Sequence, residues 1–269
     1  MMTSMLFVLS ALTLPGADDH PAPRIVGHRG LLRHAPENTL AGFGACADLR
    51  VGFELDVRRS RDGHLVVLHD DNVRRTTDGK GKVADLTLAE LKKLDAGARF
   101  DPAFAGQRVP ALTEVFALLK ERRAPAVLVA VDIKIDDEDL PKDLAALARK
   151  HGVVGQLVCI GLAIEDASLR KRLKQADAKL PLARLARTAD DIPAAVADPT
   201  ADWVYVRFIP TAEQAARVHR AGKRLFLAGV MVSGREPENW KKARASGIDA
   251  LLTDYPLDCR DTWRRAEKP

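Results

Sequence analysis

Strand-like and helix-like patterns alternate along the chain, and this alternation is the feature that most limits the fold. Short apolar runs begin near residues 24, 53, 127, 157, 182, 203, 225 and 250. Amphipathic segments with helical spacing lie between most of them, at residues 39–49, 111–123, 140–150, 168–178, 212–221 and 238–246. Strands separated by helices are joined in parallel. Eight such units in 269 residues predict an α/β fold of the (β/α)8 barrel type.

One strand-like run does not follow the alternation. Leu65–Leu68 comes too soon after Phe53–Val57 for a crossover helix, and Asp62-Gly63 between them is a strong hairpin signal. We therefore expect an antiparallel hairpin after the second strand. Together with a helix expected at residues 88–94, with Thr87 as its cap, it makes residues 62–110 an insertion at the barrel face that carries active sites.

The hairpin predicts which side chains meet. If Asp62 and Gly63 form a two-residue turn, Asp56 pairs with His69 and both point to one face. Glu54 shares that face with Asp56, because side chains alternate along a strand. Two neighbouring carboxylates repel unless a cation lies between them, and oxygen ligands suit Ca²⁺ or Mg²⁺. The pattern predicts a divalent-metal site.

The strand expected at residues 127–135 adds Asp132 and Lys134, which lie two residues apart and so share a face. Charges within an apolar strand are costly unless they are paired or bind a ligand. Asp132 is a candidate third metal ligand, and Lys134 can pair with it or hold a phosphate. A structural ion pair inside the barrel accounts for the same two residues equally well.

His28 and Arg29 follow the first strand, at the position where barrel active sites lie. A single histidine there is more often structural, but His69 supplies a second one near carboxylates. Two histidines can take a proton from a nucleophile and give one to a leaving alkoxide, while a metal and Arg29 neutralise phosphate oxygens. Glu37 and Asn38 can reach the same mouth of the barrel, although Asn38 and Thr39 also fit the cap of the next helix.

Charge and the N-terminal residues bear on partners and location. The net charge is +5, but Lys and Arg are spread along the chain without aromatic interleaving, which argues against nucleic-acid binding. Residues 1–17 contain a short apolar run followed by small residues, typical of a signal peptide, and predict an exported protein. A misplaced start codon is the alternative, and it would leave a cytoplasmic protein. No later stretch is apolar enough to span a membrane.

The motifs, in this order, resemble the glycerophosphodiester phosphodiesterase family. The matching segments are H-R-G at 28–30, E-N-T at 37–39, E-L-D-V at 54–57, D-G-H-L-V-V-L-H-D at 62–70, R-T-T-D-G-K-G-K-V at 75–83, L-T-L-A-E-L-K-K-L-D-A-G at 86–97, D-I-K at 132–134 and G-I-D-A-L-L-T-D-Y-P at 247–256. The resemblance implies one barrel domain over residues 24–260 that hydrolyses glycerophosphodiesters to glycerol phosphate and an alcohol with Ca²⁺ or Mg²⁺.

The resemblance also implies roles for individual residues. His28 and His69 would be the acid and base, Arg29 and Lys134 would contact phosphate, and the metal ligands would be Glu54, Asp56 and Asp132. Glu37 and Asn38 would support them.

The chain departs from the family pattern at two places. Asp132 stands where the family normally has a glutamate, and residues 227–232 replace an aromatic stretch that lines the glycerol side. The second departure keeps an alternative open, namely hydrolysis of lysophospholipids or other phosphodiesters. A non-catalytic binding barrel is a third interpretation, disfavoured by the complete set of histidines and carboxylates.

Overall fold

The computed structural model describes residues 22–266. The expected leader, residues 1–17, lies outside this range. Eight parallel strands form the barrel: β1 (Arg24–Gly27), β2 (Gly52–Arg59), β4 (Val129–Ile133), β5 (Leu157–Ile160), β6 (Ala183–Ala186), β7 (Trp203–Val206), β8 (Arg224–Leu227) and β9 (Ala250–Thr253). They follow one another in the order β5-β4-β2-β1-β9-β8-β7-β6. A single bridge between Cys159 and Leu182 joins the two ends of this path, so the predicted barrel is present and nearly closed.

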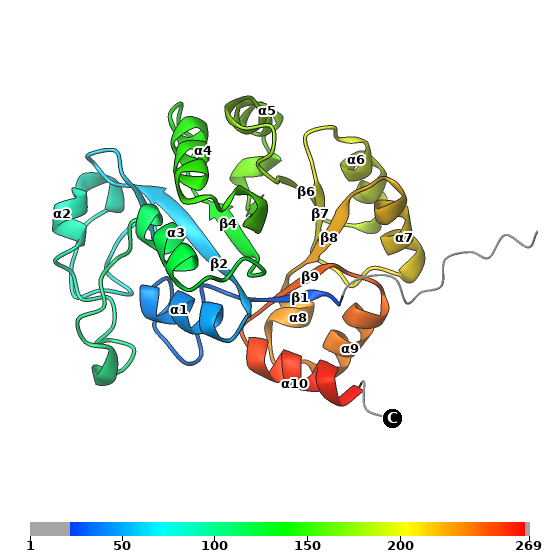
Figure 1. Cartoon of the computed structure of the whole chain (residues 1–269), viewed down its shortest axis with the longest axis horizontal. Helices are drawn as coiled ribbons and strands as arrows, with labels where there is room; N and C mark the ends of the chain where they lie inside the picture. Colours follow the sequence, from blue (N-terminus) through cyan, green and yellow to red (C-terminus); the bar gives the residue numbers. More distant parts are fainter. Residues whose placement is uncertain (1–21, 267–269) are drawn as a thin grey trace, which may run out of the picture.

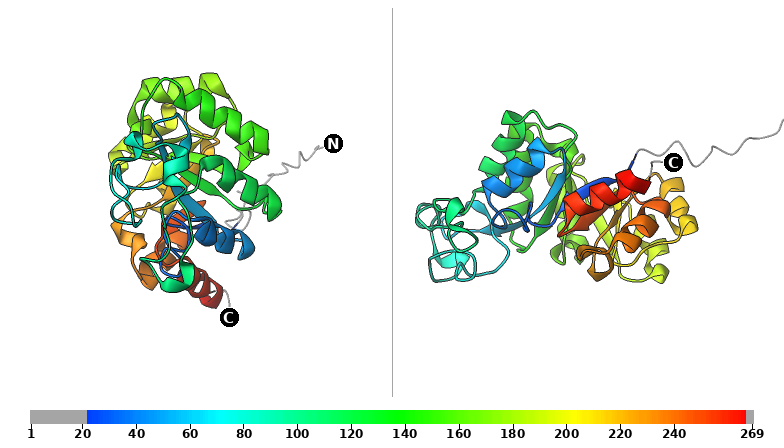
Figure 2. Two further views of the ribbon diagram at one scale, coloured as in Figure 1. Left: turned by 90° about the vertical axis from the view of Figure 1, so that its left-hand side faces the viewer. Right: turned by 90° about the horizontal axis from the view of Figure 1, so that it is seen from below.

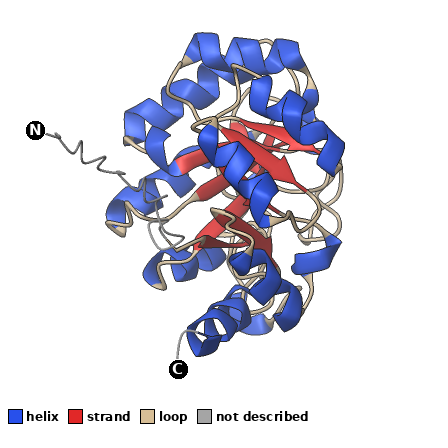
Figure 3. Ribbon diagram, turned by 90° about the vertical axis from the view of Figure 1, so that its right-hand side faces the viewer, coloured by secondary structure: helices blue, strands red, loops and turns tan. Residues whose placement is uncertain are grey.

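Helices enclose the strands on the outside (Figure 3). The helices that follow the barrel strands are α1 (Leu40–Asp48), α3 (Leu112–Glu121), α4 (Leu140–His151), α5 (Ala167–Ala176), α6 (Ile192–Ala197), α7 (Ala212–Arg220), α8 (Val230–Ser233), α9 (Pro237–Ala245) and α10 (Pro256–Ala266). The sequence patterns predicted α1, α3, α4, α5, α7 and α9 but missed α6, α8 and α10. No helix among residues 22–266 has the length and apolar character needed to cross a bilayer.

Local chemistry explains where several helices begin and end. Thr39 caps α1 by accepting a hydrogen bond from the Gly42 amide, as the capping interpretation predicted. Gly152 ends α4 in the left-handed conformation, with φ of 70°. The sequence pattern predicts that the strand beginning near residue 225 continues to Val230, which is wrong at its end. β8 stops at Leu227, and Gly229, with φ of 117°, turns the chain into α8.

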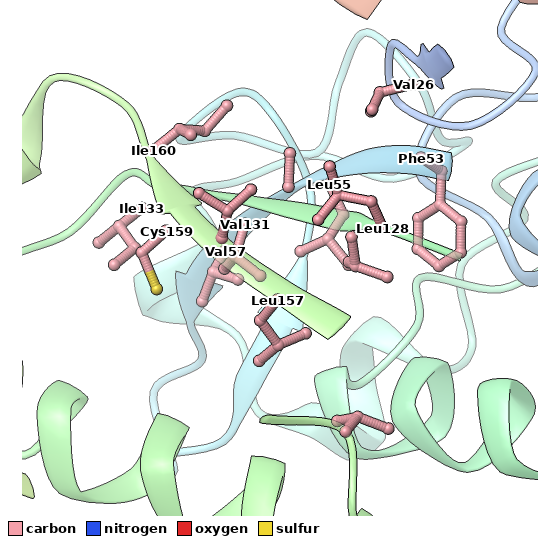
Figure 4. Packing of buried hydrophobic residues seen from close by; sticks show 14 of the residues in the cluster. Val26, Phe53, Leu55, Val57, Leu128, Val131, Ile133, Leu157, Cys159 and Ile160 are labelled. Atoms are coloured by element: carbon pink, nitrogen blue, oxygen red, sulfur yellow. The ribbon is translucent and has the colours of Figure 1, made fainter. Parts of the chain in front are cut away.

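Alternation along β2 and β4 separates the core from the site. Phe53, Leu55 and Val57 of β2 pack with Val131 and Ile133 of β4 in the apolar layer between strands and helices (Figure 4). Full burial of side chains of this size contributes roughly 1.5–3 kcal/mol each. The intervening residues of both strands therefore point into the barrel, where the charged side chains lie.

The insertion after β2 projects from one side of the barrel (Figures 1 and 2, cyan to teal). It contains β3 (Leu65–Val67) and α2 (Leu88–Leu91). Thr87 is the predicted cap of α2, and it forms a capping box with Glu90. Val66, Leu68, Val73 and Leu91 belong to a small apolar cluster of its own. The remaining helical turns of the chain are 3₁₀: Val83–Asp85, Pro102–Phe104, Val154–Gln156, Ala163–Glu165 and Ala189–Asp191.

The hairpin forms as predicted, but its predicted register is wrong by one residue. Arg59 pairs with Leu65 and Val57 with Val67, and the Leu68 amide donates to the Asp56 carbonyl. The turn contains three residues instead of two, because Gly63 adopts φ of 87° and donates its amide to Ser60. Asp56 therefore lies opposite Leu68, and the strand geometry does not bring His69 to the site.

Candidate active site

Three carboxylates meet at the C-terminal end of the barrel strands. Glu54 and Asp56 point inward from β2 and Asp132 from β4, and one oxygen of each lies within 4.8 Å of the others. The parallel register places Asp56 directly beside Asp132. Glu54 is 2% exposed and Asp56 is fully buried. The structure thus brings the three predicted metal ligands together.

A glycine makes room for the third carboxylate. Gly161 follows β5 with φ of 105°, and a Cβ atom there would lie 2.1 Å from Asp132 Oδ1. Any larger residue at this position would displace the Asp132 side chain. Gly161 therefore leaves room beside β5 for the Asp132 carboxylate.

The charges in this cluster do not balance. Burial, with the neighbouring charges of Asp56 and Asp132, raises the pKa of Glu54 well above its usual value. Burial also raises the pKa of Asp132, although Lys134 opposes that shift. The Oδ1 atom of Asp132 is buried and accepts no hydrogen bond from the described residues. A buried carboxylate oxygen without a donor, in a cluster of three carboxylates, is a feature of a divalent-cation site.

Lys134 supplies one positive charge to the cluster. Its Nζ lies 2.7 Å from Asp132 Oδ2 and 3.1 Å from Asp56 Oδ1. The pKa of Lys134 is raised, because the charges of Asp132 and Asp56 outweigh the opposing effect of burial. Lys134 is therefore charged. The ion pair that the sequence left open is present, and it occupies only one oxygen of each aspartate.

The loop after β1 holds two of the carboxylates through strained residues. Arg29 has φ of 53° and donates its backbone amide to Glu54 Oε2 at 2.8 Å. Asn38 has φ of 55° and donates its side-chain amide to Asp56 Oδ2 at 2.7 Å. A positive φ in residues other than glycine costs roughly 1–3 kcal/mol, so the surrounding structure must compensate for it. The predicted supporting position of Asn38 is thus present.

Each of the two predicted catalytic histidines is paired with an aspartate through Nδ1. His28 follows β1, and its Nδ1 lies 2.7 Å from Asp254 Oδ1. His69 follows β3, and its Nδ1 lies 2.8 Å from Asp70 Oδ1. Such a contact places the proton on Nδ1 in the neutral ring and leaves Nε2 for a substrate. Sequence reasoning missed both aspartates, although Asp70 adjoins His69 and Asp254 directly follows the last barrel strand.

The two histidines and the three carboxylates share one cavity of about 290 Å³. Its wall also includes Lys134, Tyr205, Arg207 and the segment 228–230. Arg29 and Glu37 are not part of this wall. The Arg29 guanidinium instead lies 3.1 Å from Glu37 Oε1 and 3.6 Å from Asp56 Oδ2.

Arg75 of the insertion connects these groups from outside the cavity. Its guanidinium donates to Asp70 Oδ2 at 2.7 Å and to both oxygens of Glu37 at 2.7 and 2.8 Å. The hydrogen bonds from Arg75, and then from His69, hold the pKa of Asp70 well below its usual value. The pKa of Glu37 is also lowered, because Arg75 and Arg29 outweigh the effect of burial. Arg75 therefore keeps both carboxylates ionised.

Comparisons with known proteins identify the family of this chain. The profile of the "Glycerophosphoryl diester phosphodiesterase family" matches residues 28–258. A glycerophosphodiester phosphodiesterase from Caldanaerobacter subterraneus subsp. tengcongensis is 50% identical over 111 residues, which is 41% of this chain and 44% of that protein.

Two solved structures share the fold. The crystal structure of a glycerophosphodiester phosphodiesterase from Agrobacterium tumefaciens has a TM-score of 0.74 and 28% identity, and the match covers 89% of this chain and 99% of that one. A phosphodiesterase from Oleispira antarctica, solved in complex with the product sn-glycerol-3-phosphate, has a TM-score of 0.71 and 22% identity, with 90% and 97% covered. At 22% identity, the similarity to the Oleispira antarctica protein shows a shared fold alone.

Proposed function

The chain belongs to the glycerophosphoryl diester phosphodiesterase family, whose members are phosphoric diester hydrolases, and we propose that it hydrolyses glycerophosphodiesters to glycerol phosphate and an alcohol. One observation carries the proposal. Two histidines, each supported by an aspartate on Nδ1, line the same cavity as a buried cluster of three carboxylates.

The protein residues divide the proton transfers between them. One histidine accepts the proton of the attacking hydroxyl through Nε2, and the other donates a proton to the departing alkoxide. Asp254 and Asp70 hold the two rings in orientation and stabilise whichever ring becomes charged. In this proposal Lys134, which lines the cavity, binds a phosphate oxygen, and the Arg29 guanidinium lies beside the carboxylate cluster.

We also propose that Glu54, Asp56 and Asp132 hold a divalent cation, Ca²⁺ or Mg²⁺. The fit rests on the convergence of the three carboxylates and on the buried Oδ1 atom of Asp132, which accepts no hydrogen bond from the described residues. Bound there, such an ion supplies positive charge to the phosphate oxygens of the transition state. Asp132 reaches the cluster although it is one methylene shorter than the glutamate that the family normally has.

Choline release from glycerophosphocholine tests the proposal. The metal-loaded protein should hydrolyse the ester, EDTA should abolish hydrolysis, and added Ca²⁺ or Mg²⁺ should restore it. His28→Ala and His69→Ala should each lower kcat by about 10²–10⁴-fold. His34→Ala is the matched control, because His34 is an exposed histidine of the loop after β1. Full hydrolysis by either site variant would show that these histidines are not the acid and base.

A second substrate class is favoured by apolar side chains at the mouth. Val230 is 82% exposed and lines the catalytic cavity, and Met231 beside it is 44% exposed. These side chains can contact the acyl chain of a lysophospholipid. Equal or faster release of choline from lysophosphatidylcholine than from glycerophosphocholine would identify that class as the better substrate.

Secretion of a full-length fusion and loss of residues 1–17 would test export.

A further inference from the structure

Arg207 lies between two cavities. It directly follows β7, at the same end of the barrel as the carboxylate cluster. It lines the catalytic cavity of about 290 Å³ and also a neighbouring cavity of about 860 Å³. Asp132, Lys134 and Tyr205 border both cavities as well. The neighbouring cavity therefore opens directly beside the position expected for the phosphate.

The Arg207 side chain is placed by two neighbours. It crosses the backbone of Gly229, where a Cβ atom would lie 3.1 Å from Arg207 Nε. Its guanidinium is also within hydrogen-bonding reach of the Tyr205 hydroxyl. Burial, with the charges of Asp132 and Glu54, raises the pKa of Tyr205 to about 12, so the hydroxyl remains neutral. Gly229 thus leaves space that the Arg207 side chain occupies.

The other basic residues of the neighbouring cavity already have partners. Lys134 is bound to Asp132 and Asp56, and Arg187 lies 2.7 Å from Glu165. Arg207, in contrast, forms no ion pair with any carboxylate among residues 22–266. A guanidinium without a carboxylate, at the border of a cavity, is suited to bind an anionic ligand in a bidentate geometry.

The walls of the neighbouring cavity indicate the rest of the ligand. Ile135, Leu162 and Leu185 give it apolar surfaces, and Leu162 is 71% exposed. The cavity is large enough for a small organic group. A ligand that fits it has a carbon skeleton against these side chains and a negative charge near Arg207.

We propose that the neighbouring cavity receives the alcohol half of the phosphodiester and that Arg207 binds a carboxylate or phosphate carried by that half. This inference rests on the proposed function, because it names the preferred substrate of that site. It makes anionic alcohols the favoured leaving groups over neutral alcohols of the same size.

A matched pair of substrates tests the inference. Glycerophosphoglycerol and glycerophosphoglycerate differ only in whether the alcohol half ends in a hydroxymethyl or a carboxylate group. The wild-type protein should hydrolyse the glycerate ester with a kcat/KM about tenfold higher, because a charge-assisted hydrogen bond to Arg207 is added. Arg207→Gln should remove that preference, and Arg207→Lys should retain part of it. Arg187→Gln, in the same cavity but paired with Glu165, should leave the ratio as in the wild type.

Three results would overturn the inference. The first is a wild-type protein with no preference for the glycerate ester. The second is an equal loss for both esters in Arg207→Gln, which would place Arg207 on the scissile phosphate. If neither ester is hydrolysed, the proposed function fails, and calorimetric titration of both intact esters still decides the inference. Equal affinity of the wild-type protein for both esters would then be the third contradicting result.

Discussion

Glu54→Gln should stabilise the metal-free protein and weaken the metal-bound one. Two unit charges 4.8 Å apart at an effective dielectric constant of 20 repel by about 3.5 kcal/mol. Glu54 faces two such carboxylates, and the Arg29 amide and Lys134 offset part of the repulsion. Removing its charge should raise the free energy of unfolding in EDTA by about 1–2 kcal/mol at pH 8, which corresponds to about 2–8 °C in Tm.

The pH dependence follows from the raised pKa of Glu54. The folded protein binds this proton more tightly than the unfolded chain does, for which the pKa is about 4.3. The contribution of Glu54 to stability is therefore complete below that pH and is lost as the pH rises through the folded-state pKa. The advantage of Glu54→Gln in EDTA should accordingly be small at pH 4 and largest at pH 8.

A divalent metal should reverse the order of stability. At a metal concentration of 100 times Kd, the wild type gains about 2.7 kcal/mol, and Glu54→Gln should gain much less. Calorimetric melting with EDTA and with saturating Ca²⁺ measures the gain in stability of the wild type and that of Glu54→Gln. Glu121→Gln, at an exposed position of α3, is the control and should match the wild type in both conditions. Glu54→Gln melting below the wild type in EDTA at pH 8 would refute the electrostatic reasoning, and equal metal shifts would refute the metal site.

Three further substitutions test other parts of the structure. Asp254→Asn should lower kcat by at least about 100-fold with little change in KM, because it no longer fixes the His28 tautomer, and steady-state kinetics will measure this effect. Gly161→Ala should lower both Tm and metal affinity in calorimetry, because the added methyl group collides with Asp132 Oδ1. Leu55→Ala should lower the free energy of unfolding by about 2–5 kcal/mol in urea titrations, because Leu55 is fully buried in the core.

Periodic patterns in the sequence were sufficient for the barrel and for most of its carboxylate cluster. Alternation along β2 puts Glu54 and Asp56 on the inner face, and that inference needs no knowledge of distant residues. The caps at Thr39 and Thr87 also depend only on neighbouring residues, and both are present. Strand alternation and helix capping depend on residues near in sequence, so the sequence is sufficient to predict them.

The errors occurred where a single backbone angle or a distant partner decides the outcome. The left-handed Gly63 lengthens the hairpin turn by one residue and shifts the register. The left-handed Gly229 ends β8 and starts α8. Asp254 meets His28 across 226 residues, and no pattern near either residue indicates that contact. Tertiary placement, which periodicity does not encode, determines each of these features.

The shifted register explains what the insertion does for the site. Since Leu68 lies opposite Asp56 and packs into the apolar cluster of the insertion, an extended strand would direct His69 away from that face. The strand instead ends at Val67, and the Arg58 guanidinium holds the His69 carbonyl through two hydrogen bonds of 3.0 and 2.7 Å.

Arg75 completes the placement of His69 by connecting the insertion to the first loop of the barrel. It binds Asp70, which holds the His69 ring, and it binds Glu37, which in turn binds Arg29. The Arg29 backbone amide ends this series at Glu54 in the carboxylate cluster. The insertion thus contributes the second histidine and fixes its orientation relative to the cluster through charge pairs, which β-sheet pairing alone would not achieve.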